Sequence, residues 1–179
     1  MKQLLVIGLF FASILQLHAQ KFGYVDTEYI LSKMPEYKEA QKEIDQLSIK
    51  YQQEINSRRK SIDSLKHIYA QEEILYTEEM KAKKTEEIET LEKGLSEYQN
   101  SIFGYEGRIF LKRQELIKPI QDQIYQAIEK VAKKHNLQVV FDKAGDLTIL
   151  YAVATHDYTD FVLEELGLGD PTDTIDNDK

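Results

Sequence analysis

A proline-free run from residue 36 to residue 118 constrains the fold of this chain more than any other feature. Charges of both signs alternate along it, and its apolar residues recur at spacings of three and four. In its second half one apolar position repeats every seven residues, at Ile88, Leu95, Ile102, Ile109 and Leu116. This spacing is typical of an amphipathic helix that packs on a second helix. The run therefore predicts a long helix or coiled coil.

The run divides near Tyr76 and Thr77 into two halves of similar length. Thr77 is a good N-cap, and the two glutamates after it suit the positive end of a helix. Segments 36–75 and 77–118 would each extend roughly 60 Å at 1.5 Å per residue. A chain that turned here would return to its start, so we expect an antiparallel helical hairpin. One continuous helix over the whole run is the competing geometry.

Strands are predicted on both sides of the hairpin, at 22–26, 137–142 and 147–152. A glycine-containing turn between the last two predicts that they pair as a β-hairpin. Thr27 is the expected N-cap of a short helix over 28–33. The fold class we expect is therefore α+β and mostly α.

Helical segments are also predicted after the hairpin. Pro119 should kink or restart the helix, and the apolar residues that follow form one face: Ile120, Ile124, Ala127, Ile128 and Val131. Asp157 or Thr159 is expected to cap a last helix over 161–166, which Gly167 should end.

These elements suggest an arm over 36–118 and a β-containing body made of 20–35 and 119–168. Three short strands form a sheet too small to hold an independent core. Oligomerisation around a shared sheet resolves this shortage, although the pattern itself does not give the number of copies. The acidic end, 169–179, is expected to be a disordered tail.

The N-terminus has the pattern of a secretory signal peptide over residues 1–19. Lys2 precedes an apolar run over 4–15, which is shorter than the roughly 20 residues that cross a bilayer as a helix. An uncleaved anchor is therefore the weaker alternative to cleavage after Ala19. The chain has no cysteine, which excludes a lipoprotein acylated on cysteine and a disulfide framework.

Charge and motifs narrow the function classes. The net charge of −8 becomes −9 when Lys2 leaves with the signal peptide, so nucleic acid is not an expected partner. The sequence contains no HExxH, no phosphate-binding glycine loop and no GxSxG motif, which argues against the enzyme classes that use them. We therefore expect no catalytic site, no metal and no cofactor.

Two residue types inside the arm allow more than one interpretation. Gly94, Gly104 and Gly107 each cost about 1 kcal/mol relative to alanine in a helix, and they either are tolerated at close helix contacts or let the arm bend. Tyrosines on the apolar stripes, Tyr98 and Tyr105 among them, are expected to pack.

Short strings at both ends of the chain resemble the Skp/OmpH family of periplasmic chaperones, from about residue 22 to residue 168. The N-terminal strings are Phe22-Gly23-Tyr24-Val25-Asp26, Ile30-Leu31, Pro35-Glu36 and Ala40. The C-terminal strings are Pro119-Ile120-Gln121, Ile124, Ala127-Ile128, Val131-Ala132, Val139-Val140-Phe141-Asp142 and Tyr158-Thr159-Asp160. Their order, with a signal peptide before them and a long hairpin between them, carries the resemblance.

The resemblance implies a homotrimer in which each chain gives its strands to a small shared β-barrel. Three hairpins would surround a cavity that holds unfolded outer-membrane proteins in the periplasm, without ATP and without stable membrane insertion. By position, the implied trimer contacts are Phe22, Tyr24, Val25, Val139, Phe141, Ile149 and Tyr151. Well-known members of the family are basic whereas this chain is acidic, so a lipopolysaccharide-binding site is not carried over.

Candidate client-binding residues lie near the predicted tip and farther along the second helix: Ile74, Leu75, Tyr76, Met80, Phe103 and Phe110. The structural alternative is that they only close or pack the coiled coil. Basic residues near the tip either meet anionic clients or form a solvated charged face; they are Arg58, Arg59, Lys60, Lys66, Lys81, Lys83 and Lys84. A secreted coiled-coil structural or adaptor protein of the cell envelope is the alternative function.

Overall fold

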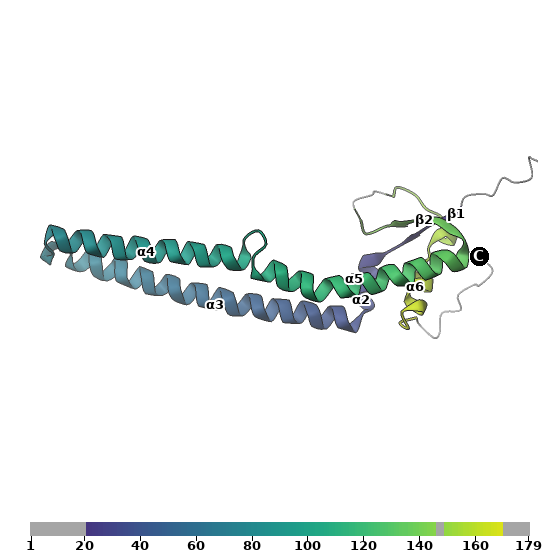
Figure 1. The fold of residues 1–179 in the computed structure, drawn as a ribbon, viewed down its shortest axis with the longest axis horizontal. Coiled ribbons are helices and arrows are strands. Elements are labelled where there is room, and N and C mark those ends of the chain that lie inside the picture. Colours follow the sequence, from purple (N-terminus) through teal and green to yellow (C-terminus); the bar gives the residue numbers. More distant parts are fainter. Residues whose placement is uncertain (1–20, 146–148, 170–179) are drawn as a thin grey trace, which may run out of the picture. The chain divides into compact units, whose positions relative to one another are not determined.

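The computed structural model describes residues 21–145 and 149–169 (Figure 1). The predictions for the signal peptide, for residues 147 and 148 and for nearly all of the acidic tail lie outside the described residues. The elements in chain order are β1 (Lys21–Val25), α2 (Thr27–Lys33), α3 (Pro35–Glu72), η2 (Glu73–Leu75), α4 (Glu78–Phe103), α5 (Arg108–His135), β2 (Leu137–Asp142), η3 (Ala154–His156) and α6 (Thr159–Glu165). The chain forms two units, which are an arm of residues 34–122 and a body that combines the described residues before 34 and after 122.

The arm contains a helical hairpin. α3 and α4 run side by side in opposite directions (Figure 1), and η2, Tyr76 and Thr77 connect them. The Thr77 hydroxyl accepts a hydrogen bond of 3.3 Å from the Met80 N–H, so the predicted turn and the predicted N-cap are confirmed. The alternative of one continuous helix is wrong, because the Tyr76 backbone is extended, with ψ of 141°.

Buried isoleucines form the seam between α3 and α4; they are Ile55, Ile62, Ile88 and Ile102. Two polar bridges connect the same helices. The Lys66 ammonium lies 2.5 Å from the Glu92 carboxylate, and the Tyr98 hydroxyl donates a hydrogen bond of 2.7 Å to Glu54. The seam is thus a narrow apolar stripe with charged and hydroxyl groups beside it.

The chain that returns from the tip of the hairpin, through α4 and α5, is interrupted at residues 104–107. α4 ends at Phe103 and α5 begins at Arg108, so the prediction of a continuous helix over 77–118 is wrong here. A Cβ at the buried Gly107 would lie 2.6 Å from the Ile102 carbonyl oxygen, closer than van der Waals contact permits. Only glycine therefore fits the end of this loop without a backbone shift.

α5 continues through Pro119 to His135, so the predicted restart of the helix at this proline is wrong. Proline removes the N–H that would bond the carbonyl four residues earlier. Because Pro119 and Glu115 are both exposed, water is able to bond that carbonyl. Within the described ranges, none of the helices combines the length and the apolarity needed to cross a lipid bilayer.

β1 and β2 form a parallel two-stranded sheet. The predicted β-hairpin between 137–142 and 147–152 is therefore wrong, and residues 149–153 adopt no strand conformation. A parallel pair needs a long crossover connection, which the chain between the two strands supplies. The other edge of β1 is also occupied, since the Tyr158 N–H donates to the Tyr24 carbonyl at 2.9 Å.

The core of the body comprises Val25, Ile30, Ile124, Ala127, Val131, Tyr158, Phe161, Val162 and Leu163. Ile124, Ala127 and Val131 belong to the predicted amphipathic face, whose burial is confirmed. Gly167 follows the C-cap of α6 and has a positive φ of 73°, and the Leu168 N–H bonds the Leu163 carbonyl at 2.8 Å. This is a Schellman ending, and it confirms the predicted stop.

Candidate interaction surfaces

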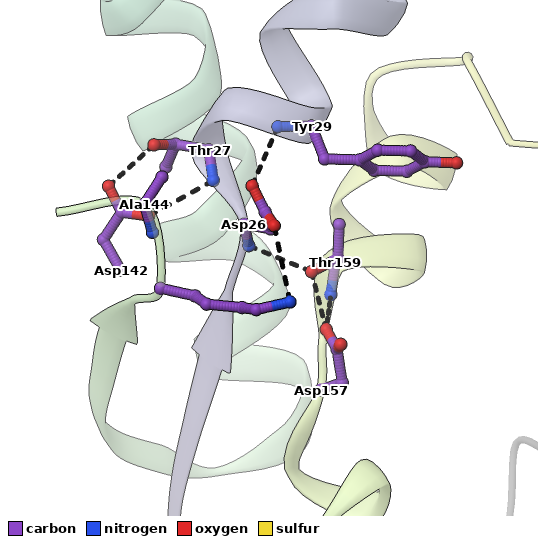
Figure 2. Close-up of polar contacts among 8 residues, drawn as sticks. Asp26, Thr27, Tyr29, Asp142, Ala144, Asp157 and Thr159 are labelled. Atoms are coloured by element: carbon purple, nitrogen blue, oxygen red, sulfur yellow. Dashed lines mark hydrogen bonds and ion pairs between the residues drawn. The ribbon is translucent and has the colours of Figure 1, made fainter. Parts of the chain in front are cut away.

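The carboxylate of Asp142 fastens the end of β2 to the start of α2 (Figure 2). It accepts hydrogen bonds from the Thr27 N–H at 3.2 Å and from the Thr27 hydroxyl at 2.6 Å. The Ala144 N–H donates a third hydrogen bond, of 3.0 Å, to the same side chain. Two segments that are 115 residues apart in sequence are therefore connected through one aspartate.

Asp26 caps α2, and the prediction that Thr27 does so is wrong. The Asp26 Oδ1 accepts a hydrogen bond of 2.8 Å from the Tyr29 N–H, and its Oδ2 lies 3.6 Å from the Lys143 ammonium. The Thr27 hydroxyl does not reach back to its own helix because it donates to Asp142 instead.

Thr159 joins the start of α6 to the same region (Figure 2). Its hydroxyl accepts from the Asp26 N–H at 3.0 Å and donates to Asp157 at 2.6 Å. Burial raises the pKa of the neighbouring Tyr24, and the Asp157 carboxylate raises it further. No group of three or more potential metal ligands occurs in the parts of the chain that the structure describes. We conclude that the carboxylates of Asp26, Asp142 and Asp157 serve to position the backbone.

One face of the sheet is apolar and partly uncovered. In the parallel register Phe22 lies opposite Val139, and Tyr24 lies opposite Phe141; side chains two residues apart in a strand share a face. Phe22 is 51% exposed and Val139 is 48% exposed. Val25 points to the other face and is buried in the core. It is therefore separated from the other predicted trimer contacts of the sheet.

A hollow of about 410 Å³ lies beside this face, lined by Phe22, Gly23, Tyr24, Phe141, Ile149, Tyr151, Ala152, Val153 and His156. It brings together five of the seven predicted contacts. Sequence reasoning missed Val153 and His156, although the His156 ring lies 4.9 Å from the Phe22 ring. The only signal for these two residues was their place after an apolar segment that was predicted to be a strand.

The tip of the hairpin exposes most of the apolar residues predicted there. Ile74 is 90% exposed, Leu75 is 78% exposed and Met80 is 46% exposed. Tyr76 is turned onto the arm, where its ring lies 6.1 Å from that of Tyr69 and its hydroxyl donates to a glutamate of α3. This hydrogen bond raises the pKa of Tyr76.

Phe103 and Phe110 are also partly exposed, but they flank the loop at 104–107, at the opposite end of α4 from the tip. The structure thus separates the predicted client-binding residues into two sets. Tyr105 lies in the loop between the two phenylalanines and is 94% exposed, so the prediction that it packs on the stripe is wrong.

Most of the basic side chains near the tip pair with nearby carboxylates. The pairs are Arg58–Glu54, Lys66–Glu92, Lys81–Glu78, Lys83–Glu79 and Lys84–Glu87. Exposed pairs of this kind contribute little to stability, but within each pair the two opposite charges neutralise one another. The pairing favours the interpretation of a solvated charged face.

Comparisons with known proteins agree with this architecture. The structure is similar to that of a Caulobacter crescentus CB15 protein described as an OmpH-like outer membrane chaperone, with a TM-score of 0.65 and 10% sequence identity over 83% of each chain. The sequence is 32% identical, over 145 residues, to an uncharacterized protein of Aquifex aeolicus (strain VF5), which covers 81% of this chain and 85% of that protein. The family model of OmpH-like outer membrane proteins matches residues 21–166. This chain therefore belongs to the OmpH-like family of outer membrane proteins.

Proposed function

We propose that the protein is an ATP-independent holdase chaperone of the periplasm, which binds unfolded outer-membrane proteins and prevents their aggregation. The observation that carries the proposal is the exposure of Ile74 and Leu75 at the tip of the arm. Apolar side chains are stabilised by burial, and a group of exposed ones commonly marks an interaction site. Membership of the OmpH-like family and the description of the Caulobacter protein as a chaperone support the same role.

The chemistry of an unfolded β-barrel precursor fits such an arm. The precursor exposes alternating apolar residues and unpaired strand edges. Apolar contacts scattered along a charged helical hairpin would each bind it weakly, and several together would hold it more tightly than any one alone. Met80 at the tip is well suited to varied partners because its side chain is flexible and polarizable. Binding and release of this kind need no nucleotide.

The proposed assembly is a homotrimer built through the body. A two-stranded sheet with an uncovered apolar face does not form a stable core alone, and Phe22 and Val139 on that face are about half exposed. Partner copies that placed strands or the segment 149–153 beside this face would fill the hollow and complete a shared barrel. The seven predicted contact residues remain part of this proposal, with Val25 supporting the sheet from its inner side.

The proposed location is the periplasm, after cleavage of residues 1–19 as a signal peptide. We place the arm at 36–118 and the body at 20–35 and 119–168, with an acidic tail after it. No nucleic acid, metal or cofactor is part of the proposal, and we expect no enzymatic activity.

Light scattering on the mature protein, alone and mixed with a urea-unfolded outer-membrane β-barrel protein diluted into buffer, tests this proposal. The expected result is the mass of a trimer, and a soluble complex under conditions in which the β-barrel protein alone precipitates. A monomer or dimer that leaves the β-barrel protein to aggregate would contradict the proposal. Saturable binding to one folded envelope protein would then favour the adaptor alternative.

A further inference from the structure

The loop at residues 104–107 is extruded from the arm and does not become part of the helix. Tyr98 on α4 bonds Glu54 on α3, and Lys112 on α5 lies 3.0 Å from Glu43 on α3. The loop stands out between α4 and α5 in Figure 1. α3 therefore has one polar contact with the returning chain before the loop and another after it.

The backbone of this loop is conformationally demanding. Glu106 has a positive φ of 53°, which is unfavourable for a residue with a side chain. Gly107 accepts no Cβ, as described above. A strained backbone that the surrounding structure maintains is a reason to look for a function.

What the loop displays is aromatic. Tyr105 within the loop is 94% exposed, and Phe103, Phe110 and Leu111 on the flanking helices are 42%, 41% and 53% exposed. These four residues form the loop patch. The loop thus exposes a tyrosine to solvent near three other partly exposed apolar side chains. An uninterrupted helix would not contain this loop.

The distance between the loop patch and the tip indicates what kind of partner would use both. α4 has 26 residues, so the two exposed groups are separated by about 39 Å at 1.5 Å per residue. An extended polypeptide covers this distance with about 12 residues. A single unfolded segment is thus able to reach from Ile74 and Leu75 to Tyr105 while it lies along one arm.

We propose that the loop patch is a second client-binding point on each arm, and that the tip and Tyr105 hold the same extended apolar segment of an unfolded chain. This inference rests on the proposed function. Contact at two points joined by one chain raises the effective concentration at the second point after the first has bound. Clients with exposed apolar stretches longer than about 12 residues are therefore retained, whereas shorter ones are released.

The test measures binding of two fluorescent peptides with alternating apolar and polar residues, one of six residues and one of 20, to the full mature protein by anisotropy. The variants are Tyr105→Ser, a tip variant with Ile74→Ser and Leu75→Ser, and the combination of both. Tyr105→Phe keeps the ring, and Tyr125→Ser removes a tyrosine that is 64% exposed elsewhere on α5. Because Tyr105 has almost no contacts, its substitution leaves the helices intact, which circular dichroism verifies.

For the 20-residue peptide we expect Tyr105→Ser and the tip variant each to weaken binding about tenfold, and the combination to weaken it only slightly more, because loss of either point removes the bridging. The six-residue peptide should lose less than threefold to either variant, and Tyr105→Phe and Tyr125→Ser should bind both peptides like the wild type. Unchanged binding of the longer peptide by Tyr105→Ser, or equal losses for both lengths, would overturn the inference. A wild-type protein that binds neither peptide nor the unfolded β-barrel protein would instead overturn the proposed function, and the inference with it.

Discussion

The hydroxyl of Tyr98 on α4 donates a hydrogen bond of 2.7 Å to the carboxylate of Glu54 on α3. Arg58 completes this cluster, since its guanidinium donates to the other Glu54 oxygen at 2.7 Å and lies 4.1 Å from the centre of the Tyr98 ring. The bond from Arg58 lowers the pKa of Glu54 most, and the bond from Tyr98 adds to that effect. The same contact raises the pKa of Tyr98. The two helices of the hairpin, α3 and α4, are thus connected by a contact whose strength depends on pH.

Replacing Tyr98 with phenylalanine should lower the urea midpoint of the arm at neutral pH, because the ring still packs but the bond to Glu54 is lost. A lowered pKa of Glu54 means that its contribution is present above the ordinary value of 4.5 and disappears as the pH falls through the lowered pKa. A raised pKa of Tyr98 means that its contribution is present below the ordinary value of 10.0 and disappears as the pH rises through the raised pKa. The difference between wild type and Tyr98→Phe should therefore be largest between these limits, and an equal difference at strongly acidic pH would contradict the assignment.

Gly107→Ala should destabilise the arm by about 1–3 kcal/mol, because the new Cβ would lie 2.6 Å from the Ile102 carbonyl oxygen. Gly94→Ala is the matched control, since no atom lies within 4 Å of a Cβ at that position inside α4. Alanine there should stabilise the helix by about 1 kcal/mol. Urea unfolding followed by circular dichroism measures both. Equal effects of the two substitutions would mean that the loop has a different conformation in solution.

Thr27→Val should destabilise the body by about 1 kcal/mol, and Asp142→Ala by about 2–3 kcal/mol, because the aspartate accepts three hydrogen bonds and the threonine hydroxyl donates one of them. Thr27→Ser keeps the hydroxyl and is the control. Hydrogen exchange of the backbone amides of residues 27 and 144, both of which donate to Asp142, would report the loss locally. A Thr27→Ser variant as unstable as Thr27→Val would show that the methyl group, and not the hydroxyl, matters.

Replacing Ile74, Leu75 and Met80 together with serine should weaken retention of an unfolded β-barrel protein by about tenfold, which corresponds to roughly 1.4 kcal/mol, a small part of what full burial of three such side chains contributes. The oligomer should keep its mass, because the tip belongs to the arm. Ile49→Ser with Ile68→Ser removes two other exposed apolar residues of α3 and should retain the client. Retention that survives the triple substitution would remove the tip from the proposed binding surface.

Local signals in the sequence located most helix ends correctly. Thr77 was predicted as an N-cap and accepts the Met80 N–H, and Gly167 was predicted as a stop and takes a positive φ. The loop at 104–107 escaped prediction because the apolar repeat runs without a break from Ile102 to Ile109. A repeat of seven is equally compatible with a continuous helix and with one whose extra residues are extruded, so the pattern could not reveal the loop.

The sequence by itself determined the helical hairpin, its turning point and the helix that Gly167 ends, because caps, glycines and the spacing of apolar residues act within a few neighbouring residues. Only the tertiary structure decided that β2 pairs with β1 in parallel, that Thr27 serves Asp142 instead of its own helix, and that Tyr105 is exposed. Each of these depends on groups that are distant in sequence or on the register between two helices. Strand pairing and register are chosen by the total packing of the chain, which no local pattern encodes.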